Sequence, residues 1–214
     1  MATSIYKPEL ARLLDVEPMT AQEKLFHIQL PNGQDLAHDP GQFVMLSVLG
    51  VGEAPISITS SPSRSNGDFE LCVRQVGDVT GALHRMEPGG KVGIRGPFGN
   101  GFPIDAMRGK DVLFAPGGLG LAPLRSLINQ VLDEREDVDR AIILYGAKRR
   151  SELLFRDELN EWVDRDDVEC LLTVDCEDEG EEWQPEQRLE CNLGVITTLF
   201  PQIEVDAKNT IAVT

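Results

Sequence analysis

The chain has 214 residues, with 20 Lys and Arg against 36 Asp and Glu, so its formal net charge is −16. An acidic protein of this kind is unsuited to coating nucleic acid or an anionic membrane surface. Hydrophobic residues make up 41% of the chain and recur along its whole length, which argues against disorder. We find no apolar run near the roughly 20 residues that a membrane span needs and no apolar signal core, so we expect a cytoplasmic protein.

The negative charge is concentrated in residues 157–190, which hold fifteen acidic and two basic side chains. This stretch is either a solvated surface or a docking surface for a basic partner. The cysteines are Cys72, Cys170, Cys176 and Cys191, and their spacing contains no Cys-x-x-Cys pair. We therefore predict four buried, unligated thiols, with no metal site and no disulfide framework.

The first half of the chain has the pattern of short strands separated by turn residues. The predicted strands lie at 10–17, 24–30, 42–48, 54–60, 69–76 and 91–95, and a short helix is predicted at 80–86. Gly, Pro and Asn mark the breaks between the strands. This spacing predicts a six-stranded antiparallel Greek-key β-barrel.

From Lys110 onward, strands and helices alternate. Strands are predicted at 111–115, 141–145, 168–174 and 210–213, and helices at 122–134, 151–163 and 193–199. This alternation predicts parallel strands joined by right-handed crossovers, which is an α/β doubly wound sheet. We place the two domains at residues 1–105 and 106–214, and we expect the second to be truncated at its last strand.

A glycine-rich segment follows the first strand of the second domain. Gly117, Gly118, Leu119 and Gly120 precede a predicted helix that carries Pro123 in its first turn. Glycines let backbone N–H groups approach a pyrophosphate closely, and a helix N-terminus adds partial positive charge. A tight turn without a ligand would have the same pattern, so this segment alone leaves both interpretations open.

Six segments, in this order, resemble the motifs of the ferredoxin–NADP reductase superfamily. They are Glu53–Ser60, Val73–Thr80, Arg95–Gly99, Gly117–Pro123, Tyr145–Leu154 and Gly194–Thr197. The variant Gly-Glu-Ala-Pro-Ile-Ser resembles the branch of the cytoplasmic hydrogenase gamma and anaerobic sulfite reductase B subunits. This resemblance implies an FAD- and NAD(P)H-binding electron-transfer subunit with an iron–sulfur partner, such as a hydrogenase or a sulfite reductase.

The resemblance also implies which residues hold FAD. The flavin-binding strand falls on Ala54, Pro55, Ile56 and Ser57. Ser57 matches the serine beside the flavin N5 atom, whereas Ala54 and Ile56 replace an arginine that pairs with phosphate and an aromatic residue that stacks on the flavin. The remaining expected FAD contacts are Arg74 and the backbone of Gly77, Val79 and Thr80, with Thr80 as a helix N-cap.

Three consecutive basic residues, Lys148, Arg149 and Arg150, follow the second strand of the nucleotide domain. In the family this loop meets the adenosine ribose, and arginine there favours a 2′-phosphate. We therefore favour NADP(H) and leave NADH open, together with the possibility of a plain solvent-facing loop.

The chain ends before two motifs that relatives carry. One is the Cys-Gly-Pro-Pro segment and the other is a cysteine cluster that holds a [2Fe–2S] centre, so no such cluster is expected within these 214 residues. Two hypotheses follow. The first is a flavin-dependent NAD(P)H oxidoreductase subunit, and the alternative is a flavin- or nucleotide-binding assembly subunit without catalysis.

Overall fold

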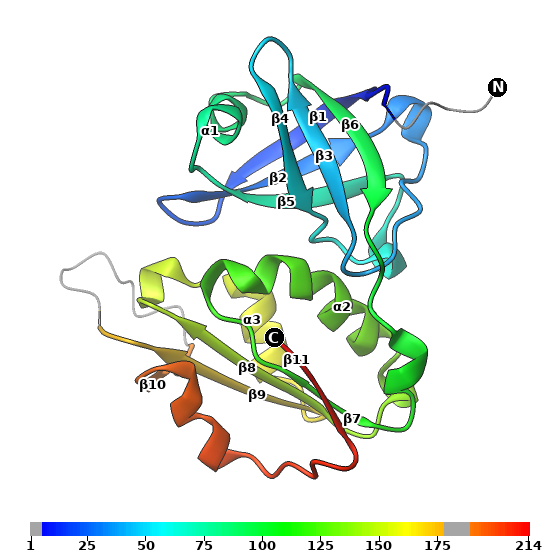
Figure 1. The fold of residues 1–214 in the computed structure, drawn as a ribbon. Coiled ribbons are helices and arrows are strands. Elements are labelled where there is room, and N and C mark those ends of the chain that lie inside the picture. Colours follow the sequence, from blue (N-terminus) through cyan, green and yellow to red (C-terminus); the bar gives the residue numbers. More distant parts are fainter. Residues whose placement is uncertain (1–5, 178–188) are drawn as a thin grey trace. The chain divides into compact units, whose positions relative to one another are not determined.

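The computed structural model describes residues 6–177 and 189–214 (Figure 1). The chain forms two compact units. One unit comprises residues 1–102 and 125–130, and the other comprises residues 103–124 and 131–214. No helix among the described residues is long and apolar enough to cross a membrane.

The first unit is built on a six-stranded antiparallel sheet. Its strands are β1 (Glu9–Pro18), β2 (Glu23–Gln29), β3 (Phe43–Val48), β4 (Gly52–Ser57), β5 (Asp68–Arg74) and β6 (Lys91–Phe98). They are ordered β4-β3-β6-β1-β2-β5. The Thr59 N–H, just after β4, donates to the Glu70 carbonyl of β5 at 2.9 Å, which links the two edges of the sheet. The predicted antiparallel barrel is therefore confirmed.

Apolar side chains of these strands fill the barrel interior. The buried core includes Leu13, Phe26, Ile28, Leu46 and Leu71, each with no exposed surface. Inward and outward positions alternate along a strand because successive side chains point to opposite faces of the sheet. This alternation explains why the strand pattern could be found from the sequence.

Helix α1 (Asp78–His84) lies between β5 and β6 and begins two residues earlier than predicted. Gly77 occupies the N-cap, with extended backbone angles. The prediction that Thr80 is the N-cap is therefore wrong. Thr80 lies inside the first turn, where its hydroxyl accepts the N–H groups of Val76 and Gly77 at 2.9 and 3.0 Å.

The second unit contains a five-stranded parallel sheet. Its strands are β7 (Asp111–Phe114), β8 (Ala141–Ala147), β9 (Val168–Val174), β10 (Asn192–Leu193) and β11 (Thr210–Val213), ordered β10-β9-β8-β7-β11. Helix α2 (Leu121–Asp133) connects β7 to β8, and helix α3 (Arg156–Val163) connects β8 to β9. The predicted doubly wound arrangement is confirmed.

Two predicted helices differ in the structure. Helix α3 begins at Arg156 rather than at residue 151, because Phe155 before it has a left-handed φ of 52°. The helix predicted at 193–199 is wrong, since this region holds β10 and the 3-10 turn Ile196–Thr198. Gly194 has a φ of +128°, and the Thr173 hydroxyl binds the carbonyls on both sides of Leu193, so this segment is held against β9.

The cysteines only partly match their predicted state. Cys72 is buried, whereas Cys170, Cys176 and Cys191 are half-buried, and all four are unpaired thiols. Burial raises the pKa of Cys72 and of Cys170 to about 12, which makes them poor thiolate ligands at neutral pH. Among the described residues we find no cluster of three or more metal-ligating side chains. Within the acidic stretch 157–190, residues 178–188 lie outside the described residues.

Candidate functional site

The glycine-rich loop connects the end of β7 to the start of α2, as predicted. The loop is anchored to the neighbouring strand, since Gly117 forms an isolated β-bridge with Gly146 and the Gly146 N–H donates to the Pro116 carbonyl at 3.2 Å. Gly120 N–H donates to the Gly117 carbonyl at 2.9 Å, which starts the helical turn, and Pro123 lies in the first turn of α2. The loop therefore lies at the carboxyl edge of the parallel sheet, where α/β proteins bind ligands.

Three of the described glycines combine open space beside the backbone with a φ outside the left-handed region. A Cβ atom built on Gly77, Gly117 or Gly120 meets nothing within 4 Å, and none of the three has a left-handed φ. By contrast, a Cβ on Gly41 would lie 2.6 Å from the Phe102 ring. The open glycines thus leave room beside the backbone on both loops that were predicted to hold phosphates, and this room fits the close approach of a pyrophosphate.

The three basic residues after β8 are not equivalent. Arg150 is fixed internally, because its Nη1 donates to the Leu189 carbonyl at 2.8 Å and its Nε lies 3.4 Å from Glu177 Oε2. Lys148 is exposed and Arg149 is half-buried, and neither side chain has a partner among the described residues. Only Lys148 and Arg149 are therefore free to meet a ligand.

Strand β4 carries the residues that were predicted to face the flavin. Ile56 packs against the barrel core, whereas Pro55 is exposed and Ser57 is half-buried. The Ser57 hydroxyl has no hydrogen-bond partner among the described residues, so it is available to a ligand. Arg95 cannot replace the arginine missing at Ala54, because its Nε and Nη2 bind Glu53 at 2.8 and 2.6 Å. This pair also holds the pKa of the Glu53 carboxyl below its usual value.

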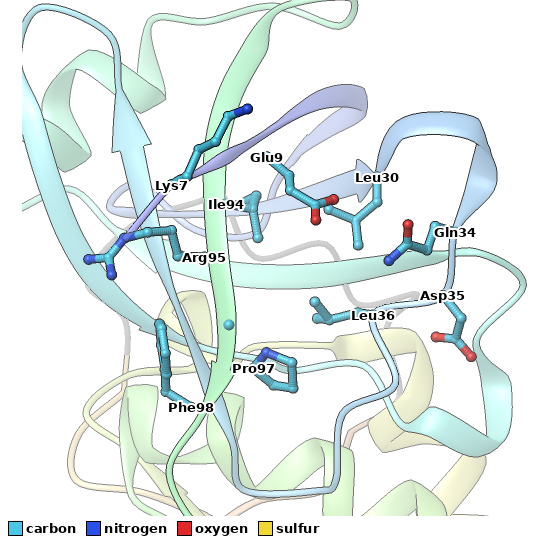
Figure 2. A pocket seen from close by; sticks show the side chains of 11 residues that line it. Lys7, Glu9, Leu30, Gln34, Asp35, Leu36, Ile94, Arg95, Pro97 and Phe98 are labelled. Atoms are coloured by element: carbon cyan, nitrogen blue, oxygen red, sulfur yellow. The ribbon is translucent and has the colours of Figure 1, made fainter. Parts of the chain in front are cut away.

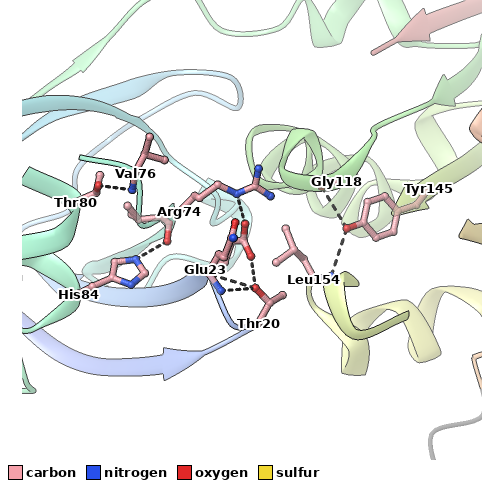
Figure 3. Close-up of polar contacts among 11 residues, drawn as sticks. Thr20, Glu23, Arg74, Val76, Thr80, His84, Gly118, Tyr145 and Leu154 are labelled. Carbon is pink, nitrogen blue, oxygen red and sulfur yellow. Dashed lines mark hydrogen bonds and ion pairs between the residues drawn. The ribbon is translucent and has the colours of Figure 1, made fainter. Parts of the chain in front are cut away.

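Arg74, at the end of β5, is oriented by a buried carboxylate (Figure 3). Its Nε donates to Glu23, which is only 3% exposed and also accepts the hydroxyl of Thr20. The two other guanidinium nitrogens have no partner among the described residues. Arg74 is therefore a cation with a fixed orientation, three residues before Gly77.

The loop between β5 and α1 has fewer free donors than the sequence suggested. The Thr80 hydroxyl accepts the N–H group of Val76 (Figure 3). It also accepts the N–H group of Gly77. Within the stretch from Gly77 to Thr80, the N–H groups that could still bind a ligand are therefore those of Asp78, Val79 and Thr80. These belong to the first helical turn, where N–H groups have no partner in the helix.

A cavity of about 190 Å³ lies beside β6 and contains none of the predicted site residues (Figure 2). Leu30, Leu36 and Ile94 give it an apolar wall, and Lys7 and Glu9 are among the polar residues that line it. The walls come from three separate segments, one of which, Ile94–Phe98, overlaps the motif Arg95–Gly99.

Sequence reasoning also missed Glu23 and Tyr145 as supports of the two loops. Tyr145 is fully buried, and its hydroxyl contacts the Gly118 carbonyl. A buried tyrosine in a strand of otherwise apolar residues and a glutamate at the start of a core strand are signals that could have found them, since buried polar groups need hydrogen-bond partners.

Comparisons with known proteins match each unit separately. Residues 10–102 match the oxidoreductase FAD-binding domain family, and residues 114–199 match the oxidoreductase NAD-binding domain family.

Relatives with curated names extend the likeness. The chain is 41% identical over 157 residues to the sulfhydrogenase 2 subunit gamma of Pyrococcus furiosus, covering 72% of this chain and 54% of that protein. It is 32% identical over 142 residues to a probable dihydroorotate dehydrogenase B (NAD(+)) electron transfer subunit of the same organism, covering 66% and 50%. The chain thus spans about half the length of these relatives.

A solved structure shares the fold at low sequence identity. The ferredoxin NADP+ reductase of Neisseria gonorrhoeae with bound FAD and NADP aligns with a TM-score of 0.73 and 18% identity, over 95% of this chain and 82% of that one. The two family matches show that the chain consists of an oxidoreductase FAD-binding domain followed by an oxidoreductase NAD-binding domain, and its two sheets share the fold of ferredoxin–NADP reductases.

Proposed function

We propose that this protein is an FAD-containing electron-transfer subunit that exchanges hydride with NAD(P)H and passes electrons to an iron–sulfur partner. We assign the FAD domain to residues 1–105 and the NAD(P) domain to residues 106–214. The observation that carries the proposal is the set of open glycines on the two predicted phosphate loops, Gly77, Gly117 and Gly120. No neighbouring atom requires the absence of a side chain at these positions, and glycine there gives a bound dinucleotide room to approach the backbone.

The residues of the first unit fit FAD. Ser57 offers a hydroxyl and Arg74 offers two guanidinium nitrogens that have no partner in the described part of the chain, and Val79 and Thr80 offer first-turn N–H groups. When bound, FAD supplies the exchange between a two-electron hydride carrier and one-electron acceptors. In our proposal Ser57 hydrogen-bonds the reactive part of the flavin, and Arg74 neutralises phosphate charge that Ala54 cannot.

The second unit fits a nicotinamide dinucleotide. The N–H groups of the loop from Gly117 to Gly120 would bind the pyrophosphate, with the N-terminus of α2 beneath them. Lys148 and Arg149 would contact the adenosine ribose, and their two unpaired positive charges support a preference for a 2′-phosphate. Arg150 belongs to this set only as a support, because it is bound to Glu177 and Leu189.

The partner is inferred from the relatives. Both are named as subunits, one of a sulfhydrogenase and one for electron transfer in a dihydroorotate dehydrogenase. We propose that this chain likewise works beside an iron–sulfur subunit, of a hydrogenase, sulfite reductase or similar cytoplasmic complex.

The test is anaerobic spectroscopy of the purified protein reconstituted with FAD. We expect stoichiometric flavin binding and loss of the flavin absorbance near ~450 nm when NADPH is added, since hydride transfer reduces the flavin. Protein that binds no flavin would contradict the proposal. Protein that binds flavin and nucleotide without bleaching would instead support the assembly-subunit hypothesis.

A further inference from the structure

Tyr145 joins the glycine-rich loop to a second segment of the nucleotide-binding unit. Its side chain is fully buried on β8. Its hydroxyl lies 3.2 Å from the Gly118 carbonyl oxygen and 3.3 Å from the Leu154 backbone nitrogen (Figure 3). The Leu154 N–H can only donate, so it occupies the hydroxyl oxygen, and the hydroxyl proton is directed to the Gly118 carbonyl.

This bond determines where the loop's donors point. In a planar trans peptide the C=O and the next N–H point in opposite directions. Because the Gly118 carbonyl points at the buried Tyr145 hydroxyl, the Leu119 N–H points away from it. Leu121 N–H also donates to the Gly118 carbonyl, so that carbonyl is held from two sides.

The loop needs this hydrogen bond because its glycines have no side chains whose packing could fix the orientation of each peptide. Gly117, Gly118 and Gly120 lack side chains, and their Cβ positions are open, so no packing restrains them. Gly118 has a left-handed φ of 51°. Glycine reaches many backbone conformations, and ordering such a segment only when the ligand arrives would cost affinity.

We propose that Tyr145 is a positioning residue. Its hydroxyl holds the peptide between Gly118 and Leu119 in the orientation in which the loop binds the dinucleotide pyrophosphate. This inference rests on the proposed nucleotide-binding function. Tyr145 does not contact the ligand in this proposal, and it acts only through the loop.

The main test compares Tyr145→Phe with Ile143→Val in the FAD-loaded protein. Ile143 is fully buried on the same strand, so its variant controls for a general loss of stability. We expect Tyr145→Phe to raise the Kd and KM for NADPH about five- to tenfold, with kcat and FAD affinity unchanged, because one hydrogen bond that preorganises the loop is lost. Ile143→Val should leave the Kd and KM unchanged. A Tyr145→Phe variant with the wild-type Kd, or an equal rise in both variants, would overturn the inference.

A second measurement keeps the proposal testable if Tyr145→Phe does not fold. The chain has two tyrosines, and the other, Tyr6, is 81% exposed. In protein labelled uniformly with 3-fluorotyrosine, saturating NADPH should shift the fluorine resonance of Tyr145 and not that of Tyr6. A Tyr145 resonance that does not shift at saturating NADPH overturns this inference but leaves the proposed function standing. Wild-type protein that binds neither NADPH nor NADH overturns the proposed function, and the inference with it.

Discussion

Replacing Gly117 by alanine separates the requirements of the fold from those of the ligand. Gly117 has φ of −119° and ψ of 131°, an extended conformation that alanine adopts freely. The added Cβ would meet no atom within 4 Å. We therefore expect Gly117→Ala to be neutral or to stabilise the protein by about 0.4–1 kcal/mol, because alanine reduces the entropy of the unfolded chain.

The same methyl group should weaken nucleotide binding. It would occupy the space through which we propose that the pyrophosphate approaches the backbone. Overpacking of this kind costs about 1–3 kcal/mol, which is roughly 5- to 150-fold in Kd. Titration calorimetry with NADPH gives the Kd, and urea unfolding gives the stability.

Gly81→Ala is the matched control. Its Cβ would lie in ordinary contact, 3.6 Å from Arg85 Nη1 and 3.8 Å from Gln75 Nε2, inside helix α1. Alanine should stabilise this helix by about 1 kcal/mol and leave NADPH affinity unchanged. If Gly117→Ala binds NADPH with the wild-type Kd, or if both variants weaken it equally, the reasoning from open glycines is refuted.

Three further predictions concern charged side chains. Glu23→Gln should lower the free energy of unfolding by about 1–3 kcal/mol, because Arg74 loses its buried charged partner. For the same reason the variant should bind FAD more weakly in fluorescence titrations. Wild-type FAD affinity would contradict the role of this pair. Burial lowers the pKa of His84 below its usual 6.5, so as the pH falls the unfolded chain binds a proton before the folded protein does. The free energy of unfolding should therefore fall as the pH drops below about 6.5. His84→Asn should remove this contribution to the pH dependence of stability measured by urea unfolding. Changing both Lys148 and Arg149 to glutamine should raise the KM for NADPH about tenfold or more and barely change that for NADH, and an equal effect on both coenzymes would contradict 2′-phosphate contact.

The sequence predicted the strands of the first unit because buried and exposed positions alternate along them, as in β1. In β7, Asp111–Phe114, all four residues are buried, which is typical of a central parallel strand. Secondary structure near the end of the chain was predicted less well, since a short strand and a 3-10 turn stand where a helix was expected at 193–199. There the local apolar pattern was outweighed by hydrogen bonds from Thr173, a residue some twenty positions away.

The place of the glycine-rich loop between β7 and α2 could be predicted from the sequence, but the residues that support the candidate site could not. Gly117, Gly118 and Gly120 could be found from the sequence, because a glycine-rich segment between a predicted strand and a predicted helix is a local pattern that indicates a phosphate-binding loop. The partners of Arg74 and Arg150 could not, because Glu23 and Leu189 come close only in the folded chain. A run of three basic residues does not reveal which of them is already bound.

Lys148 and Arg149 differ from Arg150 in how much the fold depends on them, and this difference has an evolutionary consequence. The first two form no bonds within the described fold, so their replacement carries little cost in stability. Arg150 bridges Glu177 and the Leu189 carbonyl and is not free to vary in the same way. Under the proposed function, coenzyme preference can therefore change at two neighbouring positions, while the glycine loop, which we propose binds the pyrophosphate common to NADH and NADPH, has to be kept.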